Sequence, residues 1–184
     1  PEITTATASP STFCLGTATT LSASSLIIGS GPLTLPGTYC VATGSGSSCV
    51  SLVQINTLNS TPAACVSPWY NINAPTGANT TTLIAGQSYT MTLATTGASI
   101  ISVFIDYNRN GLFEATEWVQ PWTNASTGTV AINVPVSASA GLTGMRIRSR
   151  LNGNANGSGD ACLSMGSGST EDYATFHKKT TGRL

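Results

Sequence analysis

The chain has 184 residues, of which only 8 % are charged, and its seven acidic and seven basic side chains cancel to a net charge of zero. Nucleic acid is not an expected partner, because phosphate binding needs a basic face, and no apolar run approaches the ~20 residues that span a bilayer. Apolar and aromatic residues recur throughout, which argues against a disordered chain. With so few charges, solubility must come from Ser, Thr, Asn and Gly, a composition that suits an extracellular β protein. The sequence begins at Pro1 without a signal peptide, so we expect a mature form or a fragment.

The predicted elements are short β-strands, since β-branched runs are separated by Gly, Pro, Asn and Ser and helix signals are almost absent. In chain order the candidate strands are 17–23, 26–28, 50–56, 87–95, 98–106, 128–136, 144–151 and 171–176. Segment 87–95 alternates polar and apolar residues, so one of its faces is expected to be buried. About ten strands at this spacing predict an all-β fold, namely an antiparallel β-sandwich of the jelly-roll or Ig-like type.

We expect three parts along the chain: an N-terminal strand segment at 1–38, a β-sandwich at 39–177 and a basic tail at 178–184. The first part is too short for an independent sandwich domain and must pack on something. A Gly/Ser/Asn-rich loop of about twenty residues covers 151–170, and loops of that length are usually functional or mobile.

Cysteine usage favours disulfides in an oxidising compartment, because the chain has no CxxC pair and only one histidine for structural zinc. The five cysteines are Cys14, Cys40, Cys49, Cys65 and Cys162. The sequence does not choose among the pairings. The pairing that we favour is Cys40–Cys162 with Cys49–Cys65, which leaves Cys14 free or joined to another chain.

Residues 106–117 match the calcium-loop pattern D-x-[DN]-x-[DN]-G-x5-E in every required place. The expected Ca2+ ligands are Asp106, Asn108, Asn110, the carbonyl of Leu112, Glu114 and Glu117. Alternate side chains of a tightly curled loop converge on one point, and Gly111 permits the sharp turn. A strand-like segment precedes the loop, so the hypothesis is an EF-hand-like loop inserted between strands, which stiffens the fold and does not open helices as a sensor does. The alternative is an Asn/Gly-rich hairpin turn with solvated acids.

Five motifs between Tyr39 and Phe176 carry a family resemblance. They are "YC" at 39–40, "AGQSYTMTL" at 85–93, "VFIDYNRNGLFEATEWV" at 103–119, "GMRIRSRL" at 144–151 and "GSTEDYATF" at 168–176. In order and spacing they resemble the GEVED domain of bacterial surface and secreted proteins, common in Bacteroidetes. The name motif departs from the pattern, since "STEDY" stands where "GEVEDY" is expected. The resemblance implies a secreted β-sandwich module that accompanies adhesins and secreted enzymes and has no established catalytic activity of its own.

The first 25 residues resemble the opening strands of Ig-like adhesin repeats in the same kind of secreted protein, but the rest of that repeat is missing. A half-repeat leaves an exposed sheet edge or an unpaired strand. Either the segment folds back on its own sheet, or it adds to the sheet of a neighbouring copy, as donor strands do in pili. The second alternative would make the chain a filament subunit.

Two sets of side chains are candidates for a ligand or partner face. They are Arg146, Arg148 and Arg150, and the pair Trp118 and Trp122. The arginines alternate with apolar residues, so they share one sheet face. They either pair with the chain's own acids, such as Glu171, Asp172 or Glu117, or bind an acidic glycan or a partner's carboxylate. The tryptophans either belong to the core or stack on sugar rings.

Taken together, these patterns predict a secreted, calcium-stabilised structural or adhesive protein of the bacterial cell surface, with self-assembly by strand addition as one route. A carbohydrate-binding module of a secreted enzyme or adhesin is the alternative. The expected partners are other copies of the chain, a cell-surface protein or a glycan. Catalysis is not expected, because a triad needs a positioned histidine and His177 begins a basic tail.

Overall fold

The computed structural model of this chain describes residues 3–9, 20–25, 39–63 and 65–180. The chain divides into two compact units, Pro1–Pro32 and Leu33–Leu184. Cys14, the candidate strand at 26–28 and the last four residues of the basic tail lie outside the described residues. Within the part of the chain that the structure describes, no helix is both long and apolar enough to cross a membrane.

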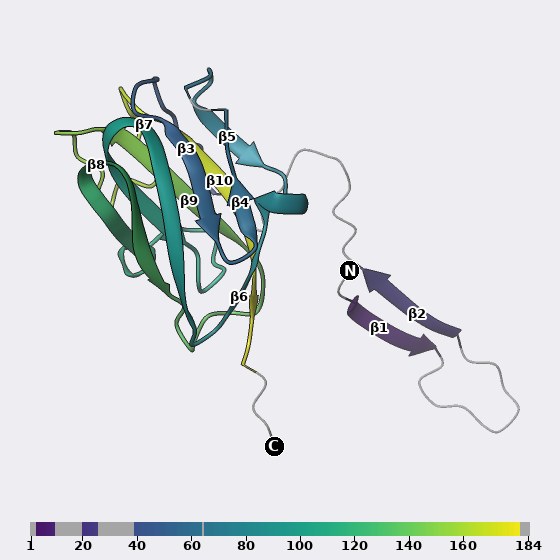
Figure 1. Cartoon of the computed structure of the whole chain (residues 1–184). Helices are drawn as coiled ribbons and strands as arrows, with labels where there is room; N and C mark the ends of the chain where they lie inside the picture. The colour runs from purple at the N-terminus through teal and green to yellow at the C-terminus, as the bar shows by residue number, and fades with distance from the viewer. Residues whose placement is uncertain (1–2, 10–19, 26–38, 64, 181–184) are drawn as a thin grey trace, which may run out of the picture. The chain divides into compact units, whose positions relative to one another are not determined.

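The first unit contains an antiparallel pair of strands. β1 (Ile3–Ser9) runs beside β2 (Thr20–Ser25), with the register extending from Ile3 opposite Ser25 to Ser9 opposite Thr20. The two strands form a sheet of their own (Figure 1). Their sequences, ITTATAS and TLSASS, contain no charged residue.

The second unit is one eight-stranded sheet with two short 3-10 helices (Figure 1). Its strands are β3 (Val50–Ile55), β4 (Leu58–Ser60), β5 (Tyr70–Asn73), β6 (Thr82–Ile84), β7 (Ser88–Ile105), β8 (Trp118–Asn133), β9 (Gly141–Leu151) and β10 (Thr170–Lys178), and the helices are η1 (Gly77–Asn79) and η2 (Ala115–Glu117). The strand order is β4-β3-β7-β9-β10-β5, with β8 paired to β7 and β6 paired to β10. β5 and β6 run parallel to β10, and the other pairs are antiparallel.

The 18-residue strand β7 organises this sheet, because it joins both halves. Its first half pairs with β3 and its second half with β9, while β8 runs along its other edge. The segments 87–95 and 98–106, expected as two strands, are therefore one continuous strand. The predicted all-β class is confirmed, and the strands of this unit form one continuous, curled sheet (Figure 1).

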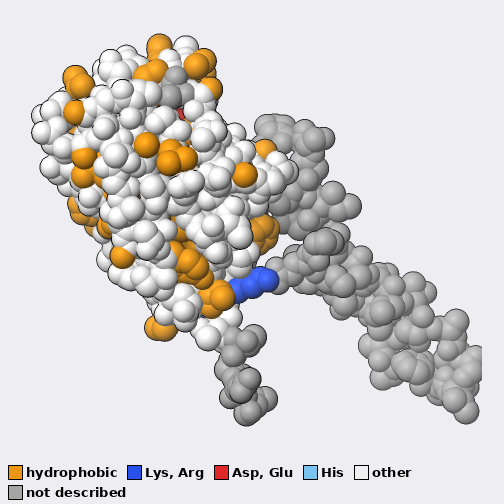
Figure 2. Space-filling view, viewed as in Figure 1, with side chains coloured by type: hydrophobic (Ala, Val, Ile, Leu, Met, Phe, Trp, Pro, Cys, Tyr) orange, Lys and Arg blue, Asp and Glu red, His pale blue; other side chains and the backbone are white. Residues whose placement is uncertain are grey.

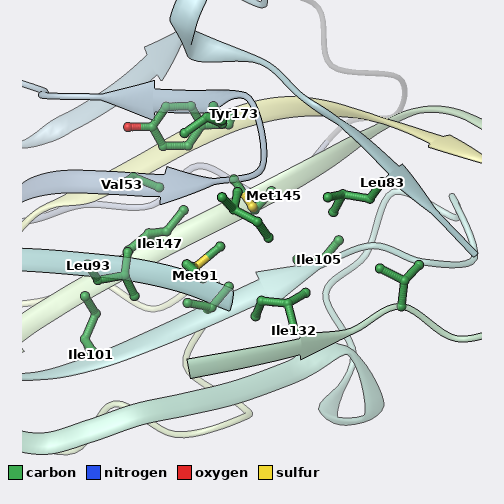
Figure 3. Packing of buried hydrophobic residues seen from close by; sticks show 14 of the residues in the cluster. Val53, Leu83, Met91, Leu93, Ile101, Ile105, Ile132, Met145, Ile147 and Tyr173 are labelled. Carbon is green, nitrogen blue, oxygen red and sulfur yellow. The ribbon is translucent and has the colours of Figure 1, made fainter. Parts of the chain in front are cut away.

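The curl encloses the main hydrophobic core, to which β3, β7, β8, β9 and β10 all contribute (Figure 3). Its fully buried members include Val53, Met91, Leu93, Ile101, Val103, Ile132, Met145, Ile147 and Tyr173. Met91 and Leu93 lie on the buried face that the period-two alternation of 87–95 predicts.

Candidate functional site

The acidic loop begins at Asp106, the first residue after β7, and the side chain of Asp106 is completely buried. Its Oδ1 accepts the main-chain N–H groups of Arg109 (2.6 Å) and Asn110 (3.2 Å). Its Oδ2 accepts the N–H of Gly111 (2.9 Å) and the hydroxyl of Tyr39 (2.5 Å). Gly111 has a φ of 81°, in the left-handed region that favours glycine, so the expected sharp turn is present. The side chain of Asp106 therefore fixes the first half of the loop by accepting its main-chain N–H groups.

The next two alternate side chains also fold back onto the loop. Asn108 Oδ1 accepts the N–H of Asn110, and Asn110 Oδ1 accepts the N–H of Leu112, both at 2.9 Å. The amide of Asn108 donates to Glu114 Oε2 at 2.7 Å. The oxygens at the first, third and fifth positions of the pattern thus turn inward, as a curled loop requires.

Glu117 closes the loop from the other end. Its Oε1 accepts the N–H groups of Tyr107 (2.8 Å) and Asn108 (3.2 Å), and its Oε2 accepts the N–H of Glu114 (3.3 Å). Burial raises the pKa of Glu117, and the charge of Asp106 raises it further. Among the described residues the single ion pair is Arg146–Asp172, so neither of these loop carboxylates has a cationic partner there. Two buried, mutually repelling carboxylates without a counter-charge are costly.

The donor set of the loop consists of oxygens, which suits a hard cation such as Ca2+. Buried carboxylates come from Asp106 and Glu117, and amide oxygens come from Asn108 and Asn110. Within the described ranges, however, no three His, Cys, Asp or Glu side chains lie close enough to form a metal cluster. The loop therefore suits calcium in its oxygen ligands and in its uncompensated negative charge. Its carboxylates alone do not complete a coordination shell.

A second constellation lies on β9 and β10, where Arg146 and Asp172 face each other in the register. Two parallel hydrogen bonds of 2.7 Å join the guanidinium Nε and Nη2 to the two carboxylate oxygens. Both side chains are fully buried, and the hydroxyl of Tyr70 donates to the same carboxylate at 2.8 Å. Burial lowers the pKa of Arg146, but the hydrogen bond and charge of Asp172 outweigh it, so the net shift is upward.

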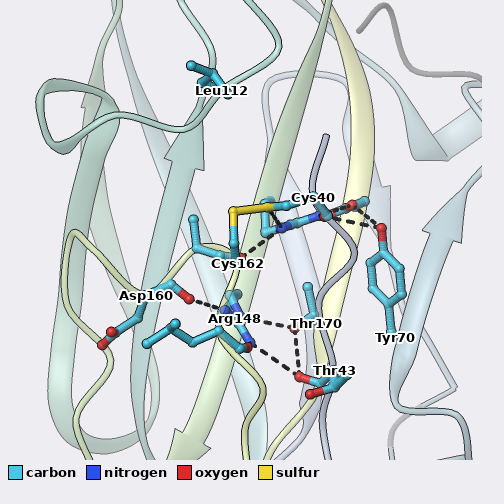
Figure 4. The surroundings of a disulfide bond; sticks show 12 residues. Cys40, Thr43, Tyr70, Leu112, Arg148, Asp160, Cys162 and Thr170 are labelled. Carbon is cyan, nitrogen blue, oxygen red and sulfur yellow. Dashed lines mark hydrogen bonds and ion pairs between the residues drawn. A yellow bond between two sulfur atoms is a disulfide. The ribbon is translucent and has the colours of Figure 1, made fainter. Parts of the chain in front are cut away.

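Arg148, two residues further along β9, is equally buried but has main-chain partners (Figure 4). Its guanidinium donates to the carbonyls of Asp160, Leu163 and Thr43 and to the hydroxyl of Thr170. Burial, reinforced by the neighbouring charge of Arg146, lowers the pKa of Arg148 to about 10. The positive charge of Arg148 is thus stabilised by carbonyl dipoles, two of which belong to the 151–170 loop.

The two arginines fasten that loop onto the sheet, and a disulfide completes the attachment. Arg146 donates to the carbonyls of Cys40 (2.8 Å) and Ala161 (2.7 Å), and Cys40 is bonded to Cys162 across the same face (Figure 4). The second disulfide joins Cys49 to Cys65, so the structure contains the pairing that the sequence analysis favours.

The ligand-face interpretation of the arginines needs correction. The three do share one face, but Arg146 and Arg148 have no exposed area and their donors are used by the chain's own loops. Arg150 is half-buried and donates to the carbonyl of Ala155 (2.6 Å) and to Asn154 Oδ1 (3.2 Å). An acidic glycan therefore has no access to two of the three guanidinium groups.

Glu171 points to the opposite face from Asp172, as their adjacency in a strand requires. It is fully buried and accepts the side-chain amides of Asn71 (2.9 Å) and Asn73 (3.3 Å) from β5. Burial raises its pKa to about 7, although both amides act in the other direction. These two asparagines are not among the predicted site residues, and their only signal in the sequence is the alternation in "YNIN" at 70–73.

Trp118 and Trp122 are half-buried on β8. Their indole N–H groups donate to Ser102 Oγ (3.0 Å) and Ser99 Oγ (3.2 Å) of β7. A pocket of about 200 Å³ opens beside Trp118, and its lining includes Tyr107, Glu117 and Asn133. The pocket therefore borders the acidic loop.

No curated protein matches the chain. Among solved structures, a CARDB domain from Pyrococcus furiosus, described in complex with di-metal ions, aligns with a TM-score of 0.31 and 9 % identity over 71 % of this chain and 96 % of its own. That likeness is too distant to support an argument. The GEVED domain model matches residues 100–175, the region that contains the acidic loop, the arginine row and Glu171–Asp172.

Proposed function

We propose that this chain is an extracellular structural or adhesive protein of the bacterial cell surface, which assembles with other copies by strand addition. The observation that carries the proposal is the separate β1–β2 sheet, which has two strands without a charged residue and is not part of the eight-stranded sheet of the second unit. A two-stranded sheet on its own is at best marginally stable in water. Pairing with another strand would supply the backbone hydrogen bonds that it lacks.

The second unit has features that suit a mechanical role. Its buried arginines and acids fasten loops to the sheet, and two disulfides hint at an extracellular location. Its halves enclose one core between them, which we take as a β-sandwich folded from a continuous sheet. The GEVED resemblance, with the secreted modules that it implies, agrees with this role.

Calcium is part of the proposal as a stiffening ion. Asp106 and Glu117 would hold it with Asn108, Asn110, Glu114 and the carbonyl of Leu112, which makes the 106–117 segment an EF-hand-like loop between strands. The support is the pair of buried loop carboxylates without a cationic partner among the described residues. A bound Ca2+ would remove their repulsion and tie the end of β7 to the start of β8.

Negative-stain microscopy and sedimentation of the full chain, in calcium and then in a chelator, test the proposal. We expect filaments or defined oligomers in calcium. A monodisperse monomer from micromolar to millimolar concentration in both conditions would overturn assembly. Filaments that persist unchanged in the chelator would support assembly and would show that it does not require calcium.

A carbohydrate-binding role is the second candidate, favoured by the pocket beside Trp118 and the acidic loop. An aromatic ring, a carboxylate and the Asn133 amide are groups that sugar-binding sites use. A glycan array probed with the wild type and with Trp118→Ala tests it. Hits that disappear in the variant would support this role, and an array without hits would exclude it.

A further inference from the structure

We infer that the free edge of β8, over Thr127–Asn133, accepts the β1–β2 sheet of a second copy of this chain. The inference rests on the proposed strand addition and specifies the acceptor edge. It follows from three observations: the pairing of β8, the absence of charge along it, and the composition and length of the proposed donor.

The pairing of β8 leaves one long edge open. β8 is hydrogen-bonded to β7 alone, and its C-terminal half is regular over seven consecutive pairs, from Thr127 opposite Ala94 to Asn133 opposite Ser88. No strand among the described residues pairs with its other edge. In the eight-stranded sheet the other strands with a single partner are β4, β5 and β6, which have three, four and three residues. β8 thus offers the longest open ladder of main-chain donors and acceptors in the described part of the sheet.

The edge also lacks the usual protection. Natural edge strands are blunted by short length, by charged side chains, by proline or by bulges. No charged residue occurs between Glu117 and Arg146, so all of β8 is uncharged. Pro121 and the irregular pairing lie in the N-terminal half, where Trp122 stands opposite Ile101 and Val119 opposite Val103. The protected half and the regular half are therefore distinct, and only the second fits an added strand.

The proposed donor matches this edge in length and chemistry. β1 has seven residues and β2 has six, against seven in the regular half of β8. β1 and β2 are rich in Thr, Ser and Ala, and neither they nor residues 127–133 of β8 carry a charge, so no repulsion opposes their pairing. Among the described strands of the single chain, β1 and β2 are hydrogen-bonded only to each other. A second copy is the occupant that supplies both an open acceptor edge and a donor sheet to every subunit, which makes the contact head-to-tail and repeatable.

Charge placed on the edge tests this assignment. The test variant is Thr129→Lys with Ala131→Lys, and both residues are exposed. The matched control is Ser88→Lys with Thr90→Lys, which are exposed on β7 directly opposite Asn133 and Ala131. The control adds the same charge one strand away from the edge. Circular dichroism of each full-length variant verifies folding, and sedimentation velocity measures assembly.

We expect the edge variant to raise the concentration needed for assembly at least about tenfold, while the control assembles like the wild type. A further variant, Ala6→Pro, disrupts the donor strand β1. If this variant does not assemble but the edge variant assembles normally, the chain does assemble by strand addition, and β8 is not the acceptor edge. If the wild type itself stays monomeric, the proposed function fails, and the inference fails with it. In that monomer, slow hydrogen exchange at the N–H groups of 127–133 that point away from β7 would show that the N-terminal segment folds back on its own sheet.

Discussion

Glu171 and His177 lie on the same face of β10, and burial moves their pKa values in opposite directions. Both side chains are almost inaccessible to solvent. Burial raises the pKa of Glu171 to about 7 and lowers that of His177 to about 4. Neither ring nitrogen of His177 has a hydrogen-bond partner among the described residues, so no hydrogen bond there offsets the burial of a charged imidazole, although the charge of Asp106 acts in its favour. Each group is consequently neutral in the folded protein over a pH range where it is charged in the unfolded chain.

The two shifts should give opposing pH dependences of stability. Between pH 4.5 and about 7 the folded state holds a proton on Glu171 that the unfolded state has released, so stability falls as the pH rises. Between pH 6.5 and about 4 the unfolded state protonates His177 and the folded state does not, so stability falls as the pH falls. We therefore expect this pair to contribute little net slope between pH 4.5 and 6.5 in the wild type.

Substituting one residue of the pair should reveal the pH dependence of stability that the other contributes. Glu171→Gln should lose up to about 3 kcal/mol of unfolding free energy as the pH is lowered from 6.5 to 4, while His177→Asn should gain a similar amount as it is lowered from 7 to 4.5. Urea unfolding at several pH values measures both. Lys178→Gln, at an exposed position of the same strand, is the control and should follow the wild type. Parallel profiles for all four proteins would contradict the assigned shifts.

The buried pair Arg146–Asp172 should be the most sensitive ionic contact of the described structure. Arg146→Met leaves the carboxylate of Asp172 buried without its bidentate partner, which typically costs about 3–5 kcal/mol. Arg150→Met is the matched control on the same face, and because Arg150 is half-buried and has no carboxylate partner we expect less than about 1 kcal/mol there. Guanidinium unfolding compares the two variants. Equal losses would show that the aliphatic stems, and not the ion pair, determine the cost.

The sequence predicted local features of this fold well, because they depend on period and residue type. Strand alternation correctly places the arginines on one face of the sheet and points Glu171 and Asp172 to opposite faces. In the acidic loop, the oxygens that turn inward come from alternate residues, as the spacing of the motif predicts. Pairing between distant segments was not predictable in this way. The parallel contacts of β5 and β6 with β10 are absent from any local pattern, and so are the amides of Asn71 and Asn73 that hold Glu171. The segments 87–95 and 98–106 were expected as two strands, yet β7 runs without interruption from Ser88 to Ile105, and only its register with β8 shifts, between Ala94 and Ser99.

The two disulfides should differ in their contribution to stability. Cys40–Cys162 closes a sequence separation of 122 residues, against 16 for Cys49–Cys65. Chain entropy predicts a loss of roughly 5 kcal/mol for Cys40→Ser with Cys162→Ser and roughly 3 kcal/mol for Cys49→Ser with Cys65→Ser. The first double variant should also speed hydrogen exchange in the loop that Arg146 and Arg148 fasten, and the second should not. A larger loss from the shorter bridge would show that native-state strain, and not chain entropy, sets the ranking.

Calcium should stabilise the fold through the charge of the acidic loop, and three variants separate this effect from hydrogen bonding. At a free concentration one hundred times its Kd, Ca2+ should add about 2.7 kcal/mol to the wild type relative to chelator. Glu117→Gln removes one of the two buried loop charges and should abolish most of that increment. Tyr39→Phe removes a hydrogen bond to Asp106 but no charge, so it should lower stability by about 1–3 kcal/mol in both conditions and keep the increment. Asp160→Asn, outside the loop, is the control that should respond to calcium like the wild type.

Thermal unfolding in calcium and in chelator distinguishes these outcomes, because only the difference between the two conditions reports the ion. An increment that persists in Glu117→Gln would contradict the loop as the binding site, even if the variant is less stable overall. An increment lost in Tyr39→Phe as well would mean that the position of Asp106, which its hydrogen bonds fix, matters as much as its charge. If calcium leaves the wild type unchanged, the loop is a self-contained turn held by its own N–H groups, and its two buried carboxylates owe their stability to those hydrogen bonds alone.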